Sequence, residues 1–204
     1  MSAPRCQPYG DRAVLIDGID DPARLAAQLA RAGQMPALID IVPAAESVLV
    51  VFDPSLVTIG MIEQAAAAAA EPVSTDPGLE EIVLEVRYDG PDLPAVADEL
   101  GWSVERVVAT HSQAPYAVRF CGFSPGFGYL TGLPREMQLA RLDEPRTRVP
   151  AGSVGVAGEY TGVYPNESPG GWRILGRTKA RLFDVERRPP ALLVPGRPVR
   201  FRPT

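Results

Sequence analysis

Hydrophobic and polar positions in the first 75 residues follow two different periods. The segment RAVLIDGI, residues 12–19, has the apolar content of a strand, and DDPARLAAQLARAG, residues 20–33, has the period of an amphipathic helix. Asp21 is the expected N-cap of that helix, Pro22 its first residue and Gly33 the residue past its end. The pattern therefore predicts a strand followed by a helix with both boundaries marked.

The rest of this segment completes a small α/β sandwich. Residues 39–54 suit two strands joined by a turn near Pro43, and residues 55–71 suit a second helix, which gives the order β-α-β-β-α over residues 1–75. The stretch EPVSTDPG that follows has prolines, a glycine and hydroxyl residues but no apolar face. We therefore expect a linker at roughly residues 72–79 and a second domain over residues 80–204.

The second half begins with a strand and a pair of helices. EEIVLEVRYD, residues 80–89, alternates like a strand, and residues 92–111 suit two short helices hinged at Gly101 with Ser103 as an N-cap. The pair resembles a helix-turn-helix, but few donors are exposed on its second helix, so we favour packing on a sheet over DNA reading. From Tyr116 onward, short apolar runs alternate with Gly and Pro, which is typical of a β-barrel or sandwich.

Composition narrows the classes of partner and chemistry. A chain of 204 residues with 46% hydrophobic residues can bury a sizeable core, and a net charge of −5 argues against nucleic acid or an anionic membrane as the main partner. Lys179 is the only lysine, which removes most lysine-based chemistry. Cys6 and Cys121 fit a reducing cytoplasm, and neither a metal site nor a signal peptide is evident.

Three features could carry chemistry. His111 is the only histidine, and it suits either acid/base work or the closing of a helix end. RFCGFSPGFGYL, residues 119–130, places glycines between aromatics and could wall an apolar pocket or form a tight turn with core aromatics. Arg177 could bind a carboxylate or phosphate, or form a surface salt bridge.

The glycine-rich stretch at residues 150–178 matches no standard nucleotide loop, because GSVGVAG is followed by a predicted strand and not by a helix. Ser153 is not part of a GxSxG motif, which argues against a serine-hydrolase triad. In SPGGW, Pro169 followed by Gly170 predicts a type II turn.

Taken together, VRFCGFSPGFGYLTGLP and PRTRVPAGSVGVAGEYTGVYPNESPGGWRILGRT resemble the 5-oxoprolinase B-subunit family, also described as allophanate hydrolase subunit 1 or KipI-like. The resemblance extends to PYGDRAVLID near the start and PGRPVRF near the end, so it covers essentially the whole chain. It implies an α+β chain with a ferredoxin-like N-terminal α/β domain at residues 1–75 and a cyclophilin-like β-barrel domain at residues 80–204.

The resemblance also implies an activity. In this family, the B-subunit works with a C-subunit and an A-subunit to open 5-oxoproline to glutamate, with hydrolysis of ATP. ATP would therefore be a co-substrate of the complex, with its binding by this chain left open. The expected partners are the C-subunit, the A-subunit and a small amide substrate, without nucleic acid or membrane, in the cytoplasm.

Carried over to this sequence, the resemblance gives candidate site residues. His111 would be an acid/base or substrate-orienting group, and Arg177 and Thr178 would bind an anion. Gly152 and Ser153 would supply backbone and hydroxyl donors, so that the catalytic set is His111, Arg177 and Ser153. Two groups of residues would form the pocket: Gly122, Phe123, Pro125, Gly126 and Tyr129 as one wall, and Tyr164, Ser168, Gly170, Gly171 and Trp172 as the opposite lip.

The resemblance leaves other functions open. A KipI-like inhibitor of a sensor histidine kinase would use the barrel as a docking surface, and an allophanate hydrolase or carboxyltransferase-like role is the third alternative. Tyr160 stands where relatives commonly carry Gln, which indicates either altered substrate selection or an exposed strand position.

Overall fold

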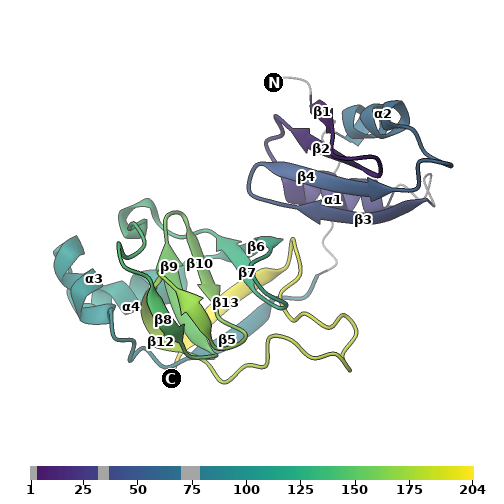
Figure 1. Ribbon diagram of the computed structural model, residues 1–204. Coiled ribbons are helices and arrows are strands. Elements are labelled where there is room, and N and C mark those ends of the chain that lie inside the picture. The colour runs from purple at the N-terminus through teal and green to yellow at the C-terminus, as the bar shows by residue number, and fades with distance from the viewer. Residues whose placement is uncertain (1–3, 32–36, 70–78) are drawn as a thin grey trace. The chain divides into compact units, whose positions relative to one another are not determined.

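The structure is a computed structural model that describes residues 4–31, 37–69 and 79–204. The chain divides into two compact units, residues 1–78 and residues 79–204 (Figure 1). The predicted helix end at Gly33 and residues 72–78 of the predicted linker lie outside the described residues. The secondary structure is α+β, as predicted from the sequence.

The first unit is an antiparallel sheet with two helices on one face. Its strands lie in the order β1-β2-β4-β3, and the sheet residues Val14, Val48 and Phe52 pack with Leu25 and Ile62 of the helices. The elements are β1 Arg5–Pro8, β2 Ala13–Asp17, α1 Pro22–Arg31, β3 Leu38–Pro43, β4 Ser47–Phe52 and α2 Ile59–Ala69.

Most elements of this unit agree with the sequence pattern. The N-cap prediction for α1 is confirmed, because Asp21 Oδ1 accepts the N–H of Arg24 at 3.1 Å. Strand β1 is absent from the predicted elements, since its four residues, RCQP, are mostly exposed and show no alternation. Its place is defined by its antiparallel register with β2, in which Cys6 pairs with Ile16. The observed order is therefore β-β-α-β-β-α.

The second unit is a seven-stranded mixed sheet that curls into a nearly closed barrel. The strand order is β12-β9-β10-β7-β6-β13-β5, in which only the β13–β5 pair is parallel, while β8 and β11 form a separate ribbon. Its strands are β5 Ile82–Val86, β6 Tyr116–Cys121, β7 Gly128–Thr131, β8 Arg146–Val149, β9 Ser153–Ala157, β10 Tyr160–Val163, β11 Ser168–Gly170, β12 Arg173–Arg177 and β13 Pro198–Pro203.

Backbone hydrogen bonds join the two edges of this sheet. The N–H of Arg87, just after β5, donates to the carbonyl of Arg177 at the end of β12, and the reverse bond has the same length of 2.9 Å. Gly90 N–H extends the contact by donating to Leu175 O at 3.0 Å. Because these bonds satisfy groups that an open sheet would leave unpaired, they bring the edge strands together.

The predicted helical pair packs on this barrel. The helices are α3 Leu93–Leu100 and α4 Val104–Gln113, and a short 3-10 turn, η1, covers Arg135–Met137. Ser103 caps α4 by accepting the N–H of Arg106 at 3.2 Å, and Gly101 ends α3 in the left-handed region. Helix α4 lies against β13 and α3 against β12, so packing on a sheet is confirmed.

Asp92 fixes the start of α3 to two strands. Its carboxylate is almost fully buried; one oxygen accepts the N–H of Ile174 at 2.6 Å, and the other pairs with the guanidinium of Arg146. One side chain therefore satisfies a buried backbone donor of β12 and neutralises a cation of β8.

Asp92→Ala should lower the free energy of unfolding by about 2–3 kcal/mol, because it leaves the buried N–H of Ile174 and the Arg146 guanidinium without their partner. Chemical denaturation measures the change. The exposed carboxylate of Asp98 on the same helix supplies the control, and Asp98→Ala should change stability by less than about 0.5 kcal/mol. Equal losses in both variants would contradict the role given to Asp92.

Candidate functional site

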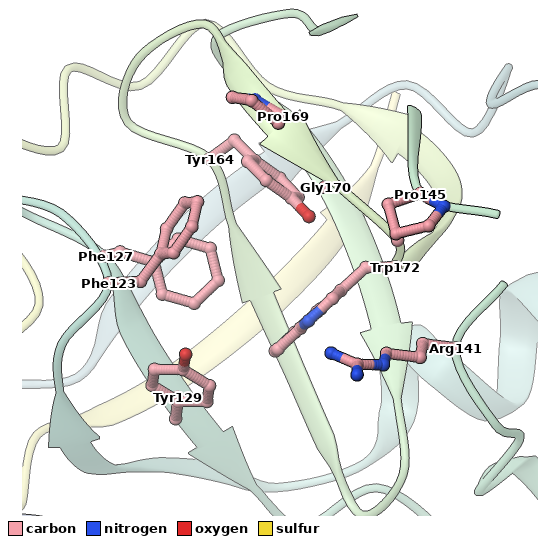
Figure 2. A pocket seen from close by; sticks show the side chains of 10 residues that line it. Phe123, Phe127, Tyr129, Arg141, Pro145, Tyr164, Pro169, Gly170 and Trp172 are labelled. Atoms are coloured by element: carbon pink, nitrogen blue, oxygen red, sulfur yellow. The ribbon is translucent and has the colours of Figure 1, made fainter. Parts of the chain in front are cut away.

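A pocket of about 280 Å³ lies on the second unit, beside strands β7, β11 and β12 (Figure 2). Half of its lining residues are aromatic, and a single arginine brings the only formal charge among them. The lining residues are Phe123, Phe127, Tyr129, Arg141, Pro145, Tyr164, Pro169, Gly170, Gly171 and Trp172. Apolar walls with a few polar groups are the usual composition of a small-molecule site.

Phe127 lies at the centre of the aromatic wall. Its ring is almost fully buried and meets Tyr129, Tyr164 and Trp172 edge to face, with centroid distances of 5.0, 5.4 and 5.4 Å. Such contacts fix ring orientations more tightly than apolar burial alone. The wall is therefore held in shape by a small hydrophobic cluster in which Phe127 and Tyr164 pack with Val149 and Ile174.

Phe123 forms the exposed part of this wall. It is 60% exposed, and its ring contacts Phe127 edge to face at 5.3 Å. Its φ of 67° is in the left-handed region, which is uncommon for a large side chain and costs free energy. The loop therefore holds this aromatic side chain at the surface in a strained backbone conformation.

Four of the lining side chains carry polar atoms: Tyr129, Tyr164, Arg141 and Trp172. Figure 2 shows the hydroxyls of Tyr129 and Tyr164 directed into the pocket and the guanidinium of Arg141 reaching toward the indole of Trp172. Burial raises the pKa of both tyrosines above the ordinary value, so their hydroxyls stay protonated at neutral pH and can donate hydrogen bonds.

Gly170 allows Tyr164 to occupy its position. A Cβ on Gly170 would lie 2.3 Å from the Tyr164 hydroxyl oxygen, closer than any non-bonded contact. The predicted type II turn at Pro169 and Gly170 is wrong, because Gly170 does not have the positive φ that such a turn requires. Residues Ser168–Gly170 instead form β11, paired with β8. The glycine is needed here for space beside the tyrosine ring.

The structure brings six of the predicted site residues together at the pocket: Phe123, Tyr129, Tyr164, Gly170, Gly171 and Trp172. Gly122, Pro125, Gly126 and Ser168 neighbour these residues in sequence but do not line it. Phe127, which the aromatic motif also offered as a wall residue, lines the pocket as well, whereas sequence reasoning missed Arg141, Pro145 and Pro169. Phe127 lies inside the quoted aromatic motif, whereas Arg141 comes from a loop whose approach to β12 has no sequence signal.

Arg177, Ser153, Gly152 and Thr178 lie together elsewhere, at one end of β9 and β12. Ser153 pairs with Arg177 in the sheet register, and Gly152 O accepts the N–H of Thr178 at 2.8 Å. The Arg177 guanidinium donates to Asp89 at 2.8 Å, so it already has an anionic partner. A catalytic or anion-binding role for these residues stays a prediction, and none of them lines the pocket.

His111 is completely buried and lies outside the pocket. Thr161 Oγ1 donates to Gly155 O at 3.0 Å, so it accepts from His111 Nε2–H at 2.9 Å. Nδ1 is then the acceptor for the Tyr88 hydroxyl at 2.7 Å. Both ring nitrogens are satisfied by the protein, and burial lowers the pKa of His111 to about 3. This arrangement is that of a neutral core histidine; the acid/base role of His111 stays a prediction.

Neither metal ligands nor an activated thiol are found in the described part of the chain. No cluster of three or more His, Cys, Asp or Glu residues there could hold a metal ion. Burial raises the pKa of the Cys121 thiol to about 11, which keeps it from acting as a thiolate nucleophile. No helix in the described residues has the length and apolar character needed to cross a membrane.

Comparisons with known proteins cover almost all of the chain. Residues 4–193 match the family described as carboxyltransferase domain, subdomain C and D. The 5-oxoprolinase B-subunit of Escherichia coli O157:H7 is 39% identical over 213 residues, covering 100% of this chain and 97% of the relative.

Solved structures show the same fold. The crystal structure of TTHA0988 has a TM-score of 0.80 and 37% identity over 95% of this chain, which covers only 40% of that longer chain. The urea carboxylase of Kluyveromyces lactis has a TM-score of 0.71 at 21% identity, over 98% of this chain and 22% of that one. The second likeness shows the fold alone.

Gly170→Ala should lower the free energy of unfolding by about 1–3 kcal/mol, because the new methyl group displaces the Tyr164 ring. Gly171→Ala is the matched control, since its nearest neighbours lie at 3.5 Å or more and its φ is not in the left-handed region. It should stay within about 0.5 kcal/mol of the native chain in thermal and urea unfolding. A Gly170→Ala variant as stable as the Gly171→Ala variant would contradict the tight contact.

The imidazole of His111 should not titrate between pH 7 and 5 in the folded chain. Because its folded pKa of about 3 lies below the ordinary value of 6.5, the stability that it contributes is present above pH 6.5 and falls with decreasing pH, by up to about 1.4 kcal/mol per pH unit. Since the chain has one histidine, NMR of a protein without a histidine tag measures this group alone. A midpoint near pH 6.5 would refute its burial.

Proposed function

Since this chain belongs to the 5-oxoprolinase B-subunit family, we propose that it is the B-subunit of an ATP-dependent enzyme that opens 5-oxo-L-proline to L-glutamate together with an A-subunit and a C-subunit. The observation that carries the proposal is the 39% identity to the Escherichia coli protein over the full length of both chains. The two motifs on which the family resemblance rests contain nine of the ten residues that line the aromatic pocket, all except Arg141.

Dependence on partner chains is the second part of the proposal. The similar TTHA0988 chain is much longer, so the same fold occurs there joined to further polypeptide. This chain has one lysine, Lys179, and no standard phosphate loop, which favours ATP binding elsewhere in the complex. In the proposed reaction ATP transfers its terminal phosphoryl group to the lactam oxygen and leaves as ADP. A first water adds to the ring carbonyl carbon, and the C–N bond breaks as the nitrogen takes a proton and becomes the amine. A second water hydrolyses the resulting acyl phosphate to the carboxylate of glutamate and inorganic phosphate.

The proposal also includes the fold group of each unit and the location of the protein in the cell. We assign the first unit to the ferredoxin-like group and the second to the cyclophilin-like barrels; the helix-covered sheet and the nearly closed barrel support these assignments. A cytoplasmic location is supported by Cys6 and Cys121, both of which are free thiols.

Glutamate release from 5-oxoproline tests this function. Three mixtures are assayed with and without ATP: this chain alone, this chain with the C-subunit, and this chain with both the C-subunit and the A-subunit. We expect ATP-dependent release only from the full mixture, because the substrate has to be activated and the site completed by other chains. A stable complex with the C-subunit that releases no glutamate in any mixture would overturn the assignment and favour the kinase-inhibitor or carboxyltransferase-like alternatives.

A further inference from the structure

Arg141 differs from the arginines around it because its side chain makes no ion pair or hydrogen bond within the described residues. Near the same pocket, Arg146 pairs with Asp92, Arg148 with Glu167 and Arg173 with Glu99. Asp143 and Glu144 follow Arg141 in the sequence without pairing with it. One guanidinium is therefore left with its planar fork of donors available beside an aromatic cavity.

The rest of the pocket suits a small flat ring. Phe127, Tyr129 and Trp172 present apolar ring surfaces, and the hydroxyls of Tyr129 and Tyr164 point into the same space (Figure 2). A volume of about 280 Å³ accommodates one five-membered ring with a carboxylate. The wall thus offers stacking surface, neutral donors and one cation.

We propose that this pocket binds the carboxylated lactam ring of the substrate, with Arg141 pairing with the carboxylate and the ring lying against the aromatic wall. The inference rests on the proposed function, which supplies a cyclic amide with a carboxylate as the substrate class. With the carboxylate at Arg141, the lactam oxygen faces the tyrosine hydroxyls, which can donate hydrogen bonds to it.

In this placement the substrate is held by its carboxylate, whereas the reaction takes place at its lactam group. The carboxylate of 5-oxoproline does not change during ring opening, so its pairing with Arg141 contributes equally to the ground state and the transition state. Loss of that pairing should then raise KM and leave kcat nearly unchanged. Arg141 is a specificity residue in this scheme, because it selects lactams that carry a carboxylate over those that do not.

Steady-state kinetics of the complex reconstituted with the A-subunit and the C-subunit tests the inference. Arg141→Gln should raise the KM for 5-oxoproline at least about tenfold, the expected cost of a charge-assisted hydrogen bond, with kcat within about twofold of the native value. Arg141→Lys should give an intermediate KM, since it keeps the charge but loses the fork. Arg135→Gln, at an exposed arginine outside the pocket, is the control and should match the native complex.

A ring without a carboxylate makes the test specific. The inhibition constant of 2-pyrrolidinone should be the same for the native complex and the Arg141→Gln complex, because this ligand has nothing for Arg141 to bind. An unchanged KM for 5-oxoproline, or equal losses for both ligands, would overturn the role of Arg141.

The two proposals can fail separately. If the native complex turns over 5-oxoproline but Arg141→Gln does not change its KM, the inference fails and the proposed function stands. If the native complex is inactive, the proposed function fails, and calorimetric titration of the full chain decides the inference. The native chain should then bind 5-oxoproline more tightly than 2-pyrrolidinone, and Arg141→Gln should remove the difference; equal affinities in the native chain would refute it.

Discussion

The reciprocal backbone hydrogen bonds between Arg87 and Arg177 are the constraint on which the second unit depends. They join the segment after β5 to the end of β12, which are the two edge strands of the sheet. The sheet therefore curves into a barrel instead of ending in two open edges. Asp92 adds a side-chain bond to Ile174 of the same strand. Since Trp172 directly precedes β12, the closure that positions this strand also positions one wall of the pocket.

Much of the fold can be predicted from the sequence because its local signals are strong. Asp21 and Ser103 act as N-caps, and the alternation in residues 80–89 gives β5, since these features depend on neighbouring residues only. Strand β1 cannot be predicted in this way, because its four residues are held by pairing with β2 and have no pattern of their own.

The site is predictable only where the motif itself forms the wall. Phe123, Tyr129 and Trp172 come from glycine-rich segments that stand out in the sequence, and they meet at the pocket. Arg141 cannot be identified in this way, because its loop is held beside the pocket by tertiary contacts, among them the hydrogen bond from Leu142 N–H to Gly171 O at 2.7 Å. From the sequence, Gly170 is expected to be needed for its backbone freedom. In the structure it is needed because any side chain at this position would collide with Tyr164. A glycine in a sequence shows that the backbone there is free to adopt unusual angles. It does not show that an aromatic ring, such as that of Tyr164, will pack where a side chain would otherwise lie.

The burial of His111 has a consequence for how the work of catalysis can be divided. Imidazole is the side chain that ordinarily exchanges protons near neutral pH. The single histidine of this chain, His111, is buried and hydrogen-bonded to Tyr88 and Thr161. No imidazole of this polypeptide can reach a molecule in the pocket. In the proposed assembly, an imidazole acting at the pocket would be one supplied by another polypeptide, so the partner chains would contribute chemistry as well as shape.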